Sequence, residues 1–150
     1  MHIGLLHFHS VWRYLALLIL IYAVLNSIKA WKAKQDYINT DNKLSLFTMI
    51  ALHIQLLTGL GLYFTSPLVQ FSNFGDVMKD THLRFWTVEH ISIMLISIAL
   101  VTIGRSKAKK AIESTSKHKK TALFYGIALF LILISIPWPF SSVARPFFSF

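Results

Sequence analysis

Two histidines lie within stretches of sequence that are otherwise apolar enough for burial in lipid. His53 lies in the middle of the apolar run 44–64, and His90 lies near the start of the run 83–103. A charged side chain at membrane depth costs about 2.5 to 3.5 kcal/mol on insertion scales, and a neutral histidine costs less, but an ionisable residue there is treated as functional by default. Two neutral imidazoles on facing helices can fill both axial positions of a haem iron without a covalent attachment. His53 and His90 are therefore candidate metal ligands for a haem b.

The residues around these histidines are consistent with haem binding. At a rise of about 1.5 Å per residue, His53 lies roughly 16 Å and His90 roughly 9 Å from the same membrane face, so the two side chains can meet. Haem also carries two propionates, which we expect to pair with Arg13 and Arg84 near that face. Trp86 lies four residues before His90 on the same helical face, where it would line a flat apolar cofactor.

Two other interpretations of the intramembrane histidines stay open. A lone histidine can hydrogen-bond a serine or a backbone carbonyl on the next helix and simply join the bundle together. The same side chains can also serve another metal or a quinone. Under the first interpretation the protein needs no cofactor at all.

Glu89 is the one acidic residue inside an apolar run, and it directly precedes His90. Consecutive residues of a helix point about 100° apart, so the two side chains have separate roles. We expect Glu89 to form an ion pair with a cation near the helix entrance, for which the candidates are His82, Arg13 and His9. Its functional alternatives are an acceptor for the N–H of a ligand histidine or a proton acceptor beside a quinone.

The N-terminal stretch "HIGLLHFHS" contains further histidines. If it is extended, alternation places His7 and His9 on one side. Together with His82 they form a candidate external copper or zinc site, since imidazole suits both metals. The alternative is that these histidines hydrogen-bond lipid headgroups or the neighbouring loop.

The elements that position these residues follow from the composition. The chain has 150 residues, of which 55% are hydrophobic and 14% charged, and its mean hydropathy is +0.57. Four apolar runs each approach the roughly 20 residues that cross a bilayer as a helix. We expect one all-α domain over 1–150, a polytopic antiparallel four-helix bundle with helices at about 10–30, 44–64, 83–104 and 120–137. Within "TALFYGIALFLILISIPWPF", residues 121–140, this last helix carries no ionisable side chain except Tyr125, which favours a helix that faces lipid or another subunit.

The formal charge of +9 is concentrated between the predicted helices. Eleven of the fifteen basic residues lie in the connections 29–43 and 105–120. The positive-inside rule places both connections in the cytoplasm, with the N- and C-termini outside. Topology and contact with anionic headgroups account for this charge, so we expect a lipid bilayer and no nucleic acid as partner. The absence of cysteine excludes disulfides, thiolate metal sites and c-type haem attachment.

Four stretches resemble a known group of proteins: "LLHFHSVWRY", "LHIQLLTGLGLYF", "RFWTVEHISIMLISIALVTIGRSKAKK" and "KHKKTALFYGIALFLILISIPWPF". Together they are similar to small four-helix bacterial inner-membrane proteins labelled cytochrome b or cytochrome b-like, and the likeness covers nearly the whole chain. The resemblance implies a b-type haem, with His53 and His90 at the positions of the intramembrane histidines.

The residues and the resemblance together predict a multi-pass protein of the bacterial inner membrane. Its expected function is electron transfer through a haem b, within or beside a respiratory complex whose other membrane subunits are its partners. This makes it an electron-transfer or accessory subunit rather than a self-contained enzyme. The alternative is a haem-free accessory or assembly subunit of a larger inner-membrane complex, in which the polar residues join helices.

Overall fold

Four long apolar helical segments make up most of the protein. The computed structural model describes residues 2–147, and its elements are α1 (His2–Lys32), α2 (Asn39–Thr65), α3 (Phe74–Lys79), α4 (Thr81–Arg84), η1 (Phe85–Glu89), α5 (His90–Lys110) and α6 (Ser114–Ser135). α4, η1 and α5 run on as one segment. This segment, α1, α2 and α6 are each long and apolar enough to cross a membrane. The all-helical, multi-pass membrane protein predicted from the composition is confirmed at this level.

The long helices extend further than predicted: α2 begins at Asn39, α5 ends at Lys110 and α6 begins at Ser114, and the largest difference is at the N-terminus. α1 begins at His2, about two turns before the predicted start near residue 10. The short helix α3, in the connection that follows α2, was not predicted. The early start of α1 matters for function because it makes the stretch that holds His7 and His9 helical instead of extended.

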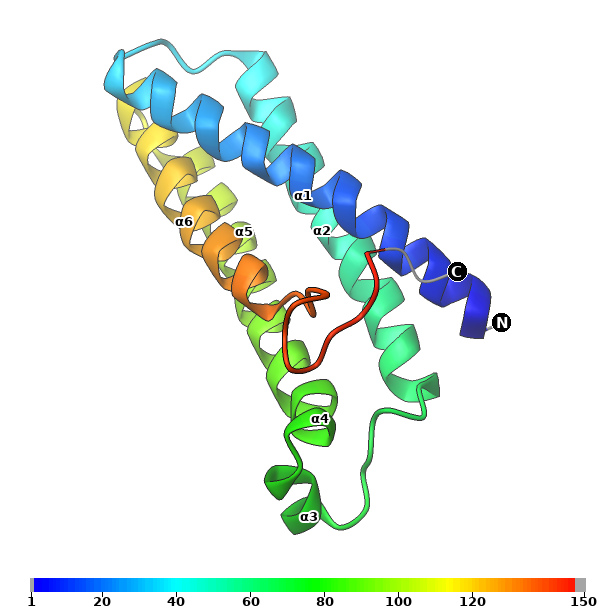
Figure 1. Cartoon of the computed structure of the whole chain (residues 1–150). Helices are drawn as coiled ribbons and strands as arrows, with labels where there is room; N and C mark the ends of the chain where they lie inside the picture. Colours follow the sequence, from blue (N-terminus) through cyan, green and yellow to red (C-terminus); the bar gives the residue numbers. More distant parts are fainter. Residues whose placement is uncertain (1, 148–150) are drawn as a thin grey trace.

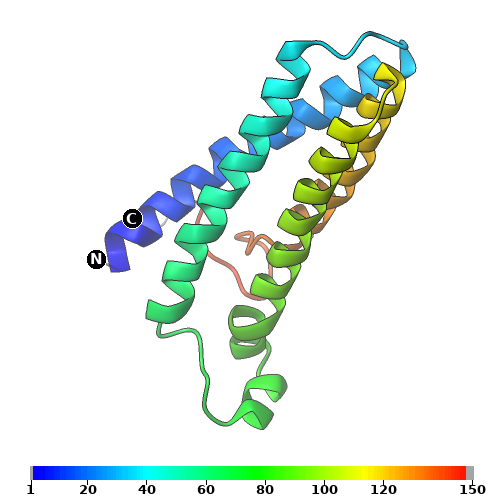
Figure 2. The same cartoon turned by 180° about the vertical axis from the view of Figure 1, so that it is seen from behind.

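The connections define two ends of the bundle (Figure 1). Residues 33–38 join α1 to α2 and residues 111–113 join α5 to α6 at one end, which we call the basic end because the lysine-rich connections lie there. The connection through α3 and α4 lies at the opposite end, which we call the cavity end, as the view from behind also shows (Figure 2). The bundle thus separates most of the basic residues from the histidines of α1 and α5.

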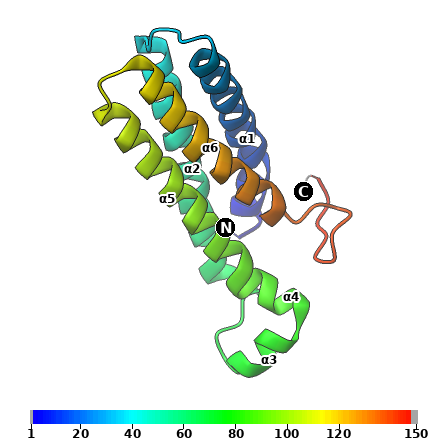
Figure 3. The ribbon, with the colours of Figure 1, turned by 90° about the vertical axis from the view of Figure 1, so that its left-hand side faces the viewer.

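Each long helix packs against two neighbours. α1 contacts α2 and α6, and α5 contacts α6 and α2, so α1 and α5 are diagonal to one another. The α5–α6 contact is the most extensive, and these helices lie alongside each other in Figure 3. The α2–α5 contact is the least extensive of the four. α6 packs on two helices and fully buries Tyr125, while Phe130 and Ile134 stay exposed, so part of its surface is free to face lipid or a partner as predicted.

A single wide turn precedes His90. Over η1 the helix has the π form, and the His90 N–H donates to the carbonyl of Phe85, five residues earlier. Such turns are rare and occur often at functional sites. Here the turn leaves the rings of Trp86 and His90 side by side, with their centroids 5.7 Å apart.

Candidate functional site

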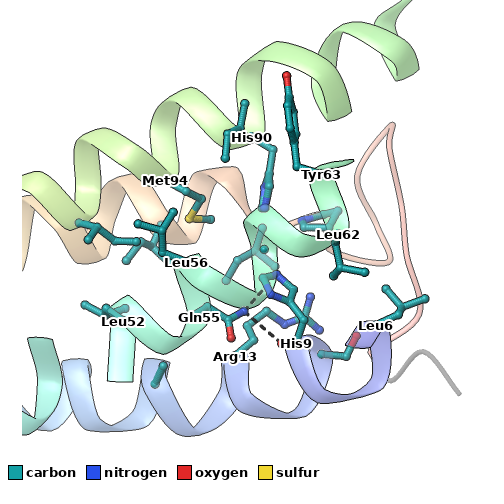
Figure 4. A pocket seen from close by; sticks show the side chains of 18 of the residues that line it. Leu6, His9, Arg13, Leu52, Gln55, Leu56, Leu62, Tyr63, His90 and Met94 are labelled. Atoms are coloured by element: carbon teal, nitrogen blue, oxygen red, sulfur yellow. Dashed lines mark hydrogen bonds between the residues drawn. The ribbon is translucent and has the colours of Figure 1, made fainter. Parts of the chain in front are cut away.

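A cavity of ≈140 Å³ lies inside the bundle, toward the cavity end. All four long helical segments line it, together with the segment that follows α6. Most of its wall is apolar, with side chains such as Leu52, Leu56 and Met94. A few polar side chains, labelled in Figure 4, project into it. Its volume is close to the roughly 150 Å³ of an engineered cavity that holds benzene.

His90 enters the cavity from α5. Its Nδ1 lies 2.9 Å from the carbonyl oxygen of Ser135 on α6. Because a carbonyl can only accept, Nδ1 carries the proton and donates it, so Nε2 is left with a lone pair. Histidines that bind metals are usually held in this way, with the second ring nitrogen donating to a carbonyl or carboxylate.

His9 enters the same cavity from α1, on the other side (Figure 4). The Gln55 side-chain amide lies 3.1 Å from His9 Nε2 and also donates to the His9 carbonyl at 3.1 Å. Nδ1 lies 3.1 Å from the Thr58 hydroxyl oxygen, and that hydroxyl donates onward to the Ile54 carbonyl. The amide N–H donates to Nε2, so Nδ1 carries the proton and His9 has the same tautomer as His90.

The structure brings His9, and not His53, together with His90. His53 is not among the residues that line the cavity, and its Nδ1 donates to the Met49 carbonyl of its own helix at 2.8 Å. α2 presents Leu52, Gln55, Leu56 and Gly59 to the cavity, and His53 is turned about 100° from Leu52. The prediction paired His53 with His90. Because of the rotation of α2 about its axis, His53 is turned away from the cavity, and His9 enters it instead.

Of the remaining predicted cofactor-binding residues, Trp86 and Arg13 line the cavity and Arg84 does not. Arg84 Nε instead donates to Glu89 Oε1 at 2.6 Å. This corrects the predicted partners of Glu89, which were His82, Arg13 and His9. The physical reason is the π turn, since its wider winding brings side chains five residues apart onto one face.

The predicted external copper or zinc site is not assembled in the structure. Because α1 is helical from His2, His7 and His9 point about 200° apart, and His9 is turned into the cavity. The His82 ring lies near Trp86, with 6.3 Å between centroids. Within residues 2–147 no three or more His, Asp or Glu side chains form a group that could hold a metal ion.

Gln55 and Arg145 are among the cavity residues that were not predicted. The sequence does mark Gln55 as a candidate, because it is a polar amide inside the apolar run 44–64. It does not mark Arg145, since that residue follows the helix-ending Pro137 and reaches the cavity only because the chain folds back.

Comparison of the chain with protein-family models, with curated proteins and with solved structures gave no match. The function is therefore inferred from the geometry of the cavity and the side chains around it.

Proposed function

We propose that this protein is a b-type haem protein of the bacterial inner membrane that transfers electrons within or beside a respiratory complex, with His9 and His90 as axial ligands. One observation carries the proposal: imidazoles from the diagonal helices α1 and α5 enter one cavity, and each donates its Nδ1–H to a protein acceptor. This tautomer leaves Nε2 of each ring as the coordinating nitrogen. When bound, haem b would supply one-electron redox chemistry.

The donor set fits a haem b. Two neutral imidazoles could ligate its iron, and the positive charge of the arginine side chains at the cavity would complement its carboxylates. The volume of ≈140 Å³ matches a single ring, so binding of a macrocycle requires the helices to separate. α2 and α5 have the least extensive contact of the neighbouring helices and are where this space can arise. Gln55 must also release His9 Nε2, and its bond to the His9 carbonyl can keep the amide in place.

For the membrane topology, we propose that the basic end faces the cytoplasm. The basic connections between α1 and α2 and between α5 and α6 lie together at that end, as the positive-inside rule requires of cytoplasmic loops. The four helices are then antiparallel, both termini are outside, and the cavity is in the outer half of the membrane. Electron exchange would take place near the outer face.

The test is the reduced-minus-oxidised absorption spectrum of the purified protein and of three variants. The wild type should show a b-type band, and His9→Ala and His90→Ala should lose or shift it. His53→Ala is the matched control and should keep the band, since His53 donates to its own helix and is not among the described residues that line the cavity. Loss of the band in His53→Ala but not in His9→Ala would restore the pairing of His53 with His90. A wild type without any b-type band rejects the proposal.

A second candidate, favoured by the small volume of the cavity, is a quinone-binding membrane subunit. Trp86 Nε1 and Arg13 Nε are buried N–H groups without a hydrogen-bond partner among the described residues, and Gln55 Oε1 is a buried acceptor in the same state. Such groups suit the oxygens of a quinone or quinol ring. Solvent extraction of the same preparation discriminates: one quinone per chain with no haem band supports this candidate, and a haem band with no quinone rejects it.

A further inference from the structure

Two guanidinium groups face the cavity without any acidic side chain beside them. Arg13 of α1 and Arg145 of the segment after α6 both line it. The chain has six Asp and Glu residues, all within the described part, and none of them lines the cavity. Glu89, which directly precedes His90, is paired with Arg84. The cavity therefore has a positive wall that no side chain of the described protein neutralises.

Among the described residues, Arg13 forms hydrogen bonds to neutral groups. Its Nη2 donates to the Tyr14 hydroxyl and to the Phe147 carbonyl, both at 2.9 Å. Its Nε is buried and has no hydrogen-bond partner within residues 2–147. Buried charges are normally paired, and a buried donor without an acceptor costs about 1 to 3 kcal/mol. Within residues 2–147, Arg13 thus has no anionic acceptor.

Arg145, like Arg13, lines the cavity with no acidic side chain beside it. Its half-buried guanidinium lies over the Trp86 ring, 4.9 Å from the centroid. Burial lowers the pKa of Arg145 below its ordinary value, because removal from water penalises the charged form. The Trp86 Nε1–H below it is buried and, among the described residues, also lacks an acceptor.

The segment that carries Arg145 is attached to Arg13. It leaves α6 at Pro137, and the Arg145 N–H donates back to the Pro137 carbonyl at 3.2 Å. The Phe147 carbonyl then accepts from Arg13 and, at 2.6 Å, from Tyr14. Figure 1 shows this segment crossing from the end of α6 toward α1. The C-terminal segment thus brings Arg145 to the cavity and is itself fastened to Arg13 of α1.

We propose that Arg145 and Arg13 form an anion clamp that holds an acidic group of the cavity's ligand. The ligand is then an amphiphile with an apolar ring or chain and a carboxylate or phosphate. The inference rests on the proposed function for the location of the ligand and deepens it, because a haem b carries carboxylates whereas a quinone ring does not. A lipid phosphate is the other source of the same chemistry.

Titration of the full-length protein with haem b and with its dimethyl ester, in which both carboxylates are masked, tests the clamp. Arg145→Gln and Arg13→Gln should each weaken haem b binding about ten-fold, as expected for loss of a charge-assisted hydrogen bond, and should change ester binding less than two-fold. Arg84→Gln is the matched control and should leave both affinities unchanged, since Arg84 lies outside the cavity lining. Equal weakening of haem and ester by Arg145→Gln overturns the clamp. Arg145→Lys, which keeps the charge, should retain most of the affinity.

A second experiment separates failure of the clamp from failure of the haem proposal. If the wild type binds neither form of haem, the haem proposal fails, and the clamp is tested with lipid. Vesicles of phosphatidic acid should then raise the unfolding temperature of the wild type more than vesicles of phosphatidylcholine. Arg145→Gln should abolish the difference, with circular dichroism as a check on folding. The same difference in wild type and variant overturns the clamp.

Discussion

The two ends of the bundle differ in how completely their buried polar groups are paired. At the basic end, the buried Tyr125 hydroxyl donates to the Ser45 carbonyl at 2.8 Å, and Arg105 donates to the Ser45 hydroxyl at 3.1 Å. At the cavity end, Gln55 Oε1 and Trp86 Nε1 have no partner among residues 2–147. A buried group left unpaired costs more than a paired one contributes. The basic end is therefore built for stability, and the cavity end bears a cost that a ligand can offset.

The two ends of the bundle also differ in how tightly their helices pack. At the basic end, Gly104 of α5 lies directly against Phe124 of α6, and Val101, one turn earlier, is fully buried. At the cavity end, the same helices enclose the cavity. His118 is the exception at the basic end, since it is fully buried and its Nδ1 has no partner in the described chain. Its Nε2 lies 3.4 Å from the Asp36 carbonyl, so only a lone pair is left unpaired.

The largest expected effect on stability comes from adding a methyl group where α5 and α6 touch. Gly104→Ala places Cβ within van der Waals overlap of the Phe124 side chain. Overpacking of this kind costs about 1 to 3 kcal/mol, and here a helix pair must separate, so we expect the upper part of that range. Thermal unfolding in detergent measures it.

Gly126→Ala is the control for this substitution. Its added Cβ meets only Val24 Cγ1, at 4.0 Å, which is an ordinary contact. Because alanine favours the helix over glycine by up to about 1 kcal/mol, Gly126→Ala should be neutral or stabilising. Equal unfolding temperatures for the two variants would contradict tight α5–α6 packing at the basic end.

The next effect tests the paired polar network. Tyr125→Phe removes a buried hydroxyl that bonds both the carbonyl and the hydroxyl of Ser45. The groups left unpaired should destabilise the fold by about 1 to 3 kcal/mol, while ligand binding at the other end should not change. Tyr22→Phe is the control, because Tyr22 is 61% exposed. Loss of ligand binding in Tyr125→Phe would mean that the two ends are coupled.

The helices could be predicted from the sequence, but their ends and rotations could not. The four apolar runs have the length that a bilayer demands, and this signal is strong. The start of α1 was missed because the residues before Ser10 include no proline and no Ser, Thr, Asp or Asn that would mark an earlier boundary. Rotation about the helix axis depends on packing between helices, so His53 was predicted in the place that His9 occupies.

The candidate site could be predicted only in part, because its residues depend on the same helix rotations and on tertiary folding. His90, Arg13 and Trp86 were predicted from their depth and helical spacing, and all three line the cavity. The π turn before His90 has no clear sequence signal, and it changed the partner of Glu89. Arg145 depends on how the chain folds back after Pro137, which is a tertiary effect with no local pattern.

A smaller effect on stability, with a large effect on binding, is expected when the cavity is filled. Ala16→Leu places a larger side chain at a position that lines the cavity. We expect a stability change within about 1 kcal/mol, because the added atoms have space, and loss of the b-type band. Ala23→Leu on the same helix is the control, since Ala23 is 1% exposed and is not a lining residue. It should destabilise the protein by about 1 to 3 kcal/mol. Equal destabilisation by the two variants would show that the cavity end is as tightly packed as the rest.

The smallest expected effect concerns Tyr37, in the connection at the basic end, and the pH dependence of stability. Burial raises the pKa of the Tyr37 phenol above its ordinary value. The folded protein then holds the phenolic proton more tightly than the unfolded chain does. The resulting stabilisation is complete below the unfolded-state pKa of about 10 and is lost as the pH rises through the folded-state pKa. Unfolding temperatures should therefore fall less steeply above about pH 10 in Tyr37→Phe than in the wild type. Lysines also titrate in this range, and the difference between the two proteins removes their shared contribution. Parallel curves would mean that the basic end leaves Tyr37 as open to water in the folded protein as in the unfolded chain.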